Sequence, residues 1–159
     1  MQNELHISRK RLLIVDDDED LLYILKDYFE GCGYEIYTNN TASDVFDIVE
    51  KNQPDLIILD YLLKGINGGE ICHQLKTSTV ARHIPVMLLS ASPRVLLSLG
   101  LYGCDRFIPK PFDLSMLTDE VKQLLHNDQT DAQPGPLHAS NYPLSILNNN
   151  TQLKRLPGA

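Results

Sequence analysis

Acidic, hydroxyl and amine side chains follow short apolar runs at several places in this sequence. The residues concerned are Asp16, Asp17, Asp60, Ser90 and Lys110. Apolar runs of this length are typical of strands that are buried on both faces of a sheet. Because open α/β sheets bind their ligands at the carboxyl ends of the strands, we expect these five side chains to meet at one edge of a sheet.

The chemistry that such a group suggests is phosphoryl transfer to an aspartate. Two carboxylates about 4 Å apart repel by roughly 4 kcal/mol at an effective dielectric constant near 20, so three together need cations. Lys110 and a divalent cation would neutralise Asp16, Asp17 and Asp60, and hard oxygen ligands favour Mg²⁺. Asp60 would attack phosphorus as a nucleophile, while Lys110 and Mg²⁺ stabilise charge on the transferring group and Ser90 hydrogen-bonds a phosphoryl oxygen.

Each of these residues also has an ordinary explanation. Asp16-Asp17-Asp18 is compatible with an N-cap cluster that interacts with a helix dipole. Ser90 is compatible with a cap, and Lys110 with a solvated loop lysine. Asp60 fits a cap less well, because residues 61–68 separate it from the next helical pattern. Their shared position at strand ends favours a common site.

The elements that must position these residues alternate along the chain. Strands are predicted at 11–15, 34–38, 56–60, 85–89 and 106–108, and helices at 18–30, from 41 or 43 to 52, from 68, from 92 and from 113. Gly31 and Gly33 are expected to stop the first helix, Thr41 or Ser43 to cap the second and Asp113 to cap the last. Right-handed crossovers then give an α/β fold with a doubly wound, five-stranded parallel sheet.

Composition bounds the function further. The 159 residues carry a net charge of −7 without a block of Lys and Arg, which argues against direct nucleic-acid binding. Three widely spaced cysteines, Cys32, Cys72 and Cys104, predict neither disulfides nor a metal site but small apolar core residues. The polar start and the lack of a membrane-length apolar run predict a cytoplasmic protein with no membrane contact.

The chain divides into three parts by composition. Residues 1–9 are an N-terminal extension, residues 10–127 form one domain, and residues 128–159 lose all periodicity and are rich in Pro and Asn. We interpret the last part as a flexible tail or linker.

Several of these motifs together resemble the receiver domains of two-component response regulators, in particular stand-alone regulators. The resemblance covers about residues 10–127, and its segments are Ile14-Val15-Asp16-Asp17-Asp18, Leu59-Asp60-Tyr61-Leu62-Leu63 with Gly68, Leu89-Ser90-Ala91 and Phe107-Ile108-Pro109-Lys110-Pro111-Phe112. It implies a flavodoxin-like (βα)5 fold with strand order 2-1-3-4-5 and the site at the point where the order reverses.

The resemblance also implies roles for single residues. Asp60 becomes the phosphoacceptor, and Mg²⁺ is bound by Asp17, Asp60 and the backbone carbonyl of Leu62, with Asp16 acting through water. Ser90 and Phe107 become the switch residues, and the Lys110-Pro111 peptide bond is expected to be cis. The phosphoryl donor would be a histidine kinase or a histidine phosphotransfer protein.

Two departures from the family pattern stand out. The family usually has proline four residues after the phosphoacceptor, where this chain has Lys64. Ser90 and Lys110 are slightly closer in sequence than usual, which predicts a trimmed fourth helix.

The resemblance also bears on how long the phosphorylated form lasts. Leu62, two residues after Asp60, can neither orient nor deprotonate water. We therefore expect slow self-dephosphorylation and no turnover of a substrate.

The signal is expected to leave through the fourth helix, the fifth strand of the sheet and the last helix. The segment 95–103 carries no charged residue, which indicates a docking patch for a protein partner or a second copy. Burial under tail residues 144–147 is the alternative. If the segment is a docking patch, Leu97→Glu or Leu101→Glu should weaken association without affecting phosphorylation.

Two other functional classes use an aspartate or a phosphate site on a fold of this kind. An aspartate-nucleophile phosphatase or phosphotransferase expects a second aspartate two residues after the nucleophile, and this position is Leu62. A flavin-binding module on the same fold needs a phosphate-cradling loop after the first strand, where Asp16-Asp17-Asp18 would repel phosphate.

Overall fold

Five parallel strands form the centre of the computed structural model, which describes residues 8–92 and 102–126. Their order across the sheet is β2-β1-β3-β6-β7. The strands are β1 (Arg11–Val15), β2 (Glu35–Asn39), β3 (Leu56–Asp60), β6 (Val86–Ser90) and β7 (Arg106–Pro109). Since β6 and β7 are the fourth and fifth strands of this sheet, the order 2-1-3-4-5 expected for a flavodoxin-like fold is confirmed.

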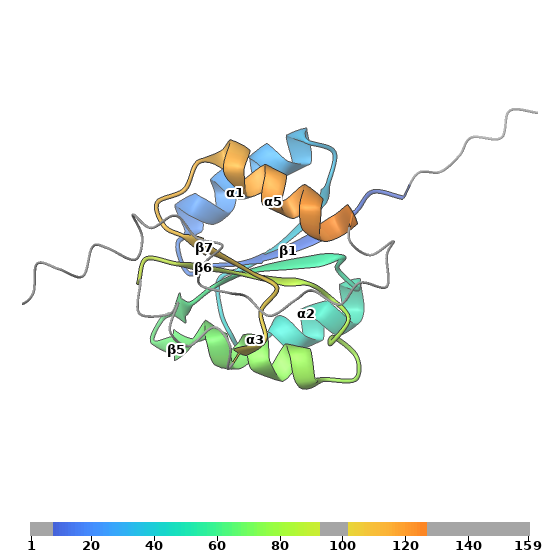
Figure 1. Cartoon of the computed structure of the whole chain (residues 1–159), viewed down its shortest axis with the longest axis vertical. Helices are drawn as coiled ribbons and strands as arrows, with labels where there is room; N and C mark the ends of the chain where they lie inside the picture. The colour runs from blue at the N-terminus through green and yellow to red at the C-terminus, as the bar shows by residue number, and fades with distance from the viewer. Residues whose placement is uncertain (1–7, 93–101, 127–159) are drawn as a thin grey trace, which may run out of the picture.

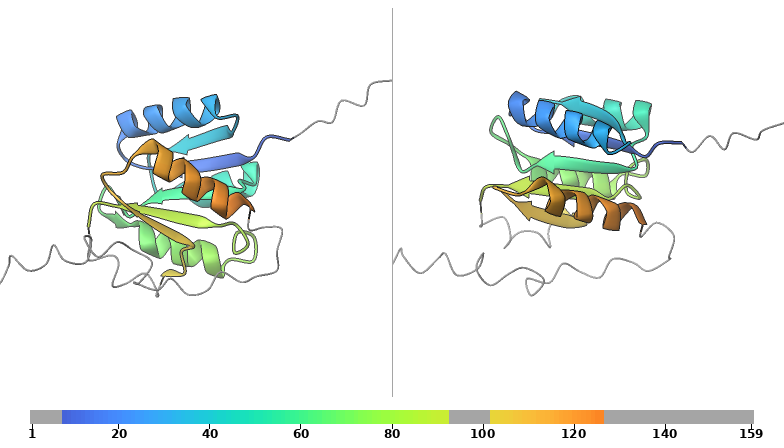
Figure 2. Two further views of the ribbon diagram at one scale, coloured as in Figure 1. Left: turned by 45° about the horizontal axis from the view of Figure 1, so that its top comes forward. Right: turned by 90° about the horizontal axis from the view of Figure 1, so that it is seen from above.

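Helices cover both faces of the sheet (Figure 1), as the pattern of the sequence predicted. One face carries α1 (Glu19–Gly31) and α5 (Leu114–His126), and the other carries α2 (Val45–Asn52) and α3 (Gly68–Thr77). The left view of Figure 2 shows the layers obliquely, and the right view looks onto the face that carries α1 and α5. The helix expected from residue 92 falls largely on residues 93–101, which lie outside the described part of the chain.

Burial on both faces explains why the inner strands are apolar up to their carboxyl ends, apart from Arg11 at the start of β1. Along β1, alternate residues face opposite layers: Leu13 and Val15 pack with α2 and α3, whereas Leu12 and Ile14 pack with α1 and α5. All five residues of β3 and of β6 are buried. Charged and hydroxyl side chains therefore appear only where these strands end.

The helix boundaries test the predicted caps. The Asp18 side chain accepts hydrogen bonds from the backbone N–H groups of Asp20 and Leu21 and caps α1, which ends at Gly31. The Asp113 side chain accepts from Met116 N–H at 2.8 Å, as predicted. The expectation for the second helix was wrong, since α2 begins at Val45 after Asp44, and neither Thr41 nor Ser43 caps it.

Two other details differ from the sequence-based picture. Residues Leu62–Leu63 (β4) and Ile66–Asn67 (β5) form a small antiparallel hairpin that was not predicted. Cys72 and Cys104 are buried as expected, but Cys32 is exposed because it lies at the carboxyl end of α1. The three cysteines are free thiols.

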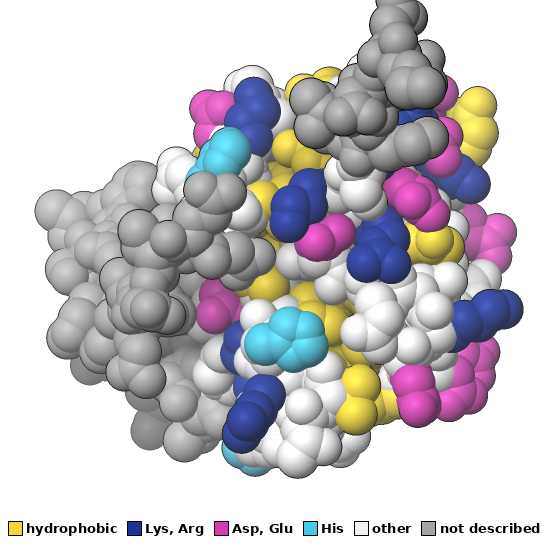
Figure 3. Space-filling view, turned by 90° about the vertical axis from the view of Figure 1, so that its right-hand side faces the viewer, with side chains coloured by type: hydrophobic (Ala, Val, Ile, Leu, Met, Phe, Trp, Pro, Cys, Tyr) yellow, Lys and Arg dark blue, Asp and Glu magenta, His cyan; other side chains and the backbone are white. Residues whose placement is uncertain are grey.

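The surface at the end where the strands begin, seen in Figure 3, shows Lys and Arg side chains interspersed with Asp and Glu. Lys10 and Arg11 contribute there to ion pairs with Asp55, at 3.0 and 3.8 Å. Among the described residues, no helix is long and apolar enough to cross a membrane.

Candidate functional site

The register of the sheet brings the predicted site residues together. Val15 is paired with Leu59, Asp60 with Leu89, and Ser90 with Pro109. The residues that end or follow β1, β3, β6 and β7 therefore lie at one edge. All five residues predicted from the sequence, namely Asp16, Asp17, Asp60, Ser90 and Lys110, are at this edge.

A lysine joins two of the three carboxylates. Lys110 Nζ lies 2.6 Å from Asp16 Oδ2 and 2.7 Å from Asp60 Oδ1. Asp16 is 1% exposed and Asp60 is 6% exposed, so both negative charges are largely removed from water. Lys110 is thus a partner of buried carboxylates and not a solvated loop lysine.

Backbone amides hold the same carboxylates from other sides. Asp16 Oδ1 accepts a hydrogen bond from Asp18 N–H at 3.0 Å, and Asp60 Oδ2 accepts one from Leu62 N–H at 2.7 Å. Asp17 Oδ2 accepts one from Lys64 N–H at 3.0 Å. Each aspartate is therefore held by a main-chain donor within a few residues of a strand end.

Burial dominates the electrostatics of Asp60. Desolvation raises the pKa of its carboxyl group, and the charge of Asp16 adds to this, while hydrogen bonds and the charge of Lys110 act in the opposite direction without reversing it. For Lys110, burial alone would lower the pKa, but hydrogen bonds to Asp16 and Asp60 raise it overall. The Lys110 amine therefore stays charged, whereas burial disfavours the negative charge on Asp60.

The donor set fits a hard divalent cation. Carboxylate oxygens of Asp16, Asp17 and Asp60 lie within 4.8 Å of one another. Three carboxylates and a single lysine carry a net negative charge. Oxygen ligands are those that Mg²⁺ prefers. These residues could hold such an ion at the edge of the sheet.

The remaining predicted residues have clear positions. Ser90 is 4% exposed, and its Oγ accepts a hydrogen bond from Ser92 N–H at 3.0 Å. Phe107 is 2% exposed and belongs to the apolar layer beneath α2 and α3. The Lys110-Pro111 peptide bond is cis. The apolar segment 95–103 lies outside the described residues, except for the buried Tyr102 and for Gly103.

Sequence reasoning missed the polar contacts around the β4–β5 hairpin. The Asn67 side chain caps α3 through Gly69 N–H and donates to the Tyr102 hydroxyl at 3.1 Å. The ring of Tyr102 lies edge-on to Tyr61, at 6.2 Å between centroids. The signal available was Gly65 between apolar residues, because glycine readily adopts the positive φ that short hairpin turns require.

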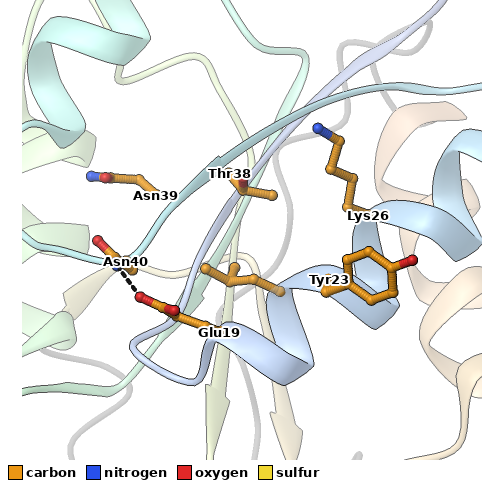
Figure 4. A pocket seen from close by; sticks show the side chains of 7 residues that line it. Glu19, Tyr23, Lys26, Thr38, Asn39 and Asn40 are labelled. Atoms are coloured by element: carbon orange, nitrogen blue, oxygen red, sulfur yellow. Dashed lines mark hydrogen bonds between the residues drawn. The ribbon is translucent and has the colours of Figure 1, made fainter.

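A separate hollow of about 340 Å³ lies between α1 and the edge strand β2 (Figure 4). Glu19, Tyr23 and Lys26 line it from the helix, and the Asn40 side chain donates a hydrogen bond to Glu19 at 2.8 Å. None of its lining residues belongs to the carboxylate cluster, so it is a surface feature distinct from the site.

Comparisons with known proteins show the family to which the chain is similar. The family model for the response regulator receiver domain matches residues 12–122. The alkaline phosphatase synthesis transcriptional regulatory protein PhoP of Bacillus subtilis is 31% identical over 126 residues, covering 77% of this chain and 51% of PhoP. The DNA-binding response regulator MtrA of Mycobacterium leprae is 33% identical over 128 residues, covering 79% and 56%. The chain spans about half the length of these curated relatives.

Solved structures show the same likeness. The signal receiver domain of a signal transduction histidine kinase from Syntrophus aciditrophicus is 31% identical, with a TM-score of 0.70, and the match covers 78% of this chain and 96% of that one. A response regulator receiver domain protein from Methanospirillum hungatei is 26% identical, with a TM-score of 0.72 and coverage of 79% and 100%.

Proposed function

Since the chain belongs to the response regulator receiver domain family, and so is a phospho-accepting signalling module of a two-component system, we propose that Asp60 is its phosphoacceptor. One observation carries this assignment. Asp60 ends the central strand β3, and its nearly buried carboxylate contacts Lys110 and lies within 4.8 Å of two further carboxylates. Asp16 shares the burial, the contact with Lys110 and the neighbouring carboxylates, but it follows β1, whereas Asp60 is the last residue of the central strand.

Asp17, Asp60 and the Leu62 carbonyl would hold Mg²⁺, with Asp16 contributing through water. The ion, when bound, would supply positive charge next to the oxygens of the transferring phosphoryl group. The position of Leu62 supports its part, because its N–H already points to Asp60, and the N–H and C=O of one strand residue lie on the same side.

The chain's own residues would carry out the transfer. A carboxylate oxygen of Asp60 forms a bond to phosphorus while the bond between phosphorus and the donor's imidazole nitrogen breaks, and its electron pair stays on the imidazole. Lys110 Nζ, 2.7 Å from Asp60 Oδ1, is placed to hydrogen-bond a phosphoryl oxygen. Ser90, at the end of the adjacent strand, would hydrogen-bond another and, with Phe107, form the switch.

Intact-mass spectrometry after incubation with a small phosphodonor tests the assignment. We expect the wild-type chain to gain one phosphoryl group only when Mg²⁺ is present, and Asp60→Asn to gain none. Asp55→Asn is a matched control, because that carboxylate pairs with Lys10 at the opposite end of the sheet. A full mass gain in Asp60→Asn would refute the assignment.

The partners follow from the same proposal. The donor is a sensor histidine kinase or a histidine phosphotransfer protein, and the output is a protein partner or a second copy that binds through β7, α5 and the segment before β7. In the described part of this surface, Arg106 Nε on β7 pairs with Glu120 Oε2 on α5 at 2.7 Å. The pull-down that tests it compares wild type with Leu97→Glu and Leu101→Glu, with and without phosphorylation.

The protein acts as a phosphoacceptor and not as a turnover enzyme in this proposal. The phosphatase alternative lacks its second acid, because Leu62 occupies that position and is 59% exposed. The flavin alternative requires a phosphate beside Asp16, whose carboxylate is buried against Lys110. Neither alternative gains support from the site.

A further inference from the structure

The β4–β5 hairpin has a turn that proline cannot make. Lys64 and Gly65 connect the two strands, with φ angles of 47° and 88°, and Leu63 pairs with Ile66 on either side. A two-residue connection with positive φ at both positions is a type I′ turn, which matches the twist of the strands that it joins. Proline has a fixed φ near −65° and no N–H. The substitution of lysine for the family's usual proline therefore changes the backbone here.

This turn directs two main-chain donors to the site. Leu63 faces β5, so its neighbours Leu62 and Lys64 turn their N–H groups to the opposite side of the strand. Leu62 N–H donates to Asp60 Oδ2 at 2.7 Å, and Lys64 N–H donates to Asp17 Oδ2 at 3.0 Å. The hairpin thus holds two different carboxylates of the cluster, one through β4 and one through its turn.

Asp17 depends on this contact more than the other two acids do. Asp16 and Asp60 each have Lys110 as a cationic partner, at 2.6 and 2.7 Å. Over residues 8–92 and 102–126, Asp17 forms no ion pair, and its carboxylate is only half-buried. Without Lys64 N–H, its side chain would be free to turn into water.

We propose that the backbone amide of Lys64 is a positioning group, which fixes Asp17 in the orientation that binds Mg²⁺ while the lysine side chain is dispensable. The inference rests on the proposed function, because it assumes that Asp17 is a ligand of the ion. Ordering a ligand before binding reduces the conformational entropy lost on binding. Asp17 Oδ1 remains available to the ion while Oδ2 accepts from Lys64.

Calorimetric titration with Mg²⁺ tests this with three variants. Lys64→Pro removes the donor and excludes the positive φ, whereas Lys64→Gly and Lys64→Asn keep the donor and tolerate that φ. We expect the glycine and asparagine variants to bind Mg²⁺ within roughly twofold of wild type. Lys64→Pro should bind roughly threefold to tenfold more weakly, the range expected from immobilising one side chain.

The outcomes separate this inference from the function on which it rests. If wild type binds Mg²⁺ and Lys64→Pro binds it equally well, the positioning role is overturned and the proposed function stands. If wild type binds no Mg²⁺, the cation assignment itself fails. Weaker binding in Lys64→Gly would show that the side chain matters, which also overturns the proposal.

Hydrogen exchange of the Lys64 amide is a second measurement, which does not depend on the proline variant folding. In the wild-type chain without Mg²⁺, we expect this amide to exchange slowly because it is bonded to Asp17. Asp17→Asn, which keeps an acceptor oxygen, should retain the protection, and Asp17→Ala should lose roughly tenfold of it or more. Equal protection in wild type and Asp17→Ala would overturn the contact.

Discussion

Replacing Asp60 by asparagine should stabilise the protein at neutral pH in the absence of divalent cations. At the 4.8 Å limit of the cluster, each neighbouring carboxylate repels Asp60 by about 3–4 kcal/mol at an effective dielectric constant of 20. Lys110 at 2.7 Å offers about 6 kcal/mol of attraction on the same scale. The two repulsions and the one attraction nearly cancel, so the cost of burying the charge decides the sign.

That balance agrees with the raised pKa of Asp60, for which burial is the largest cause. Asparagine keeps the size and one acceptor oxygen for Leu62 N–H but removes the charge. Because Asp17 and Lys110 are partly exposed and their interactions are screened, we expect a gain of about 1–3 kcal/mol in the free energy of unfolding. This corresponds to a shift of roughly 1 M in the urea midpoint.

Urea unfolding in EDTA, followed by circular dichroism, measures this gain. Asp105→Asn is the control: Asp105 is partly buried, its partner Lys76 lies at 2.9 Å and, within the described part of the chain, no second carboxylate pairs with this lysine, so this change should destabilise. A lower midpoint for Asp60→Asn than for wild type, or an equal gain in Asp105→Asn, would refute the electrostatic reasoning.

The effect of pH on the same pair of proteins has a definite sign. With a folded pKa above the unfolded value of 3.8, native Asp60 holds a proton that the unfolded chain has released, so wild-type stability falls as pH rises through that window. The advantage of Asp60→Asn should therefore shrink as the pH is lowered toward 4, about the ordinary pKa of an aspartate. Added Mg²⁺ at ten times its dissociation constant should favour wild type by about 1.4 kcal/mol and also narrow the gap.

Three further substitutions test other parts of the site. Lys110→Met leaves two buried carboxylates without their cation and should lower the free energy of unfolding by about 2–4 kcal/mol in urea titrations, unlike Lys26→Met at an exposed position of α1. Gly68→Ala would place a Cβ 2.0 Å from the carbonyl oxygen of Asp60, so it should cost about 2–4 kcal/mol, and a neutral result would contradict the packing. Leu62→Glu should speed loss of the phosphoryl group, measured as the decay of intact mass, because a carboxylate can orient water; unchanged decay would exclude that role.

The sheet and most of the site follow from the sequence for one physical reason. Strands buried on both faces must be continuously apolar, so β1, β3 and β6 are visible as runs, and their ends are marked by the first polar residue. Parallel pairing then places Asp16, Asp60 and Ser90 at one edge without further information. The contact of Lys110 with both Asp16 and Asp60 depends on side-chain geometry that no run encodes.

The parts that were not predicted depend on local backbone conformation. The β4–β5 hairpin requires a positive φ at Lys64, which lysine rarely adopts. The family pattern indicates only that the usual proline is missing at this position and does not indicate which turn replaces it. The second helix was expected to start at Thr41 or Ser43, but these hydroxyls lie 3.2 Å from each other in the loop before α2. A Ser or Thr predicts the start of a helix correctly only when the preceding loop places it at the N-cap position.

The apolar layers explain why the protein tolerates an unfavourable cluster of charge. The buried side chains on both faces of the sheet stabilise the fold independently of the strand ends, so mutual repulsion among Asp16, Asp17 and Asp60 can persist without unfolding it. Any event that changes the charge at this edge then acts on three carboxylates whose negative charge Lys110 alone does not neutralise. Leu62 and Lys64 join two of these carboxylates to one hairpin, and the Asn67 side chain of that hairpin donates to the Tyr102 hydroxyl, so hydrogen bonds connect the carboxylates to the hairpin and the hairpin to Tyr102.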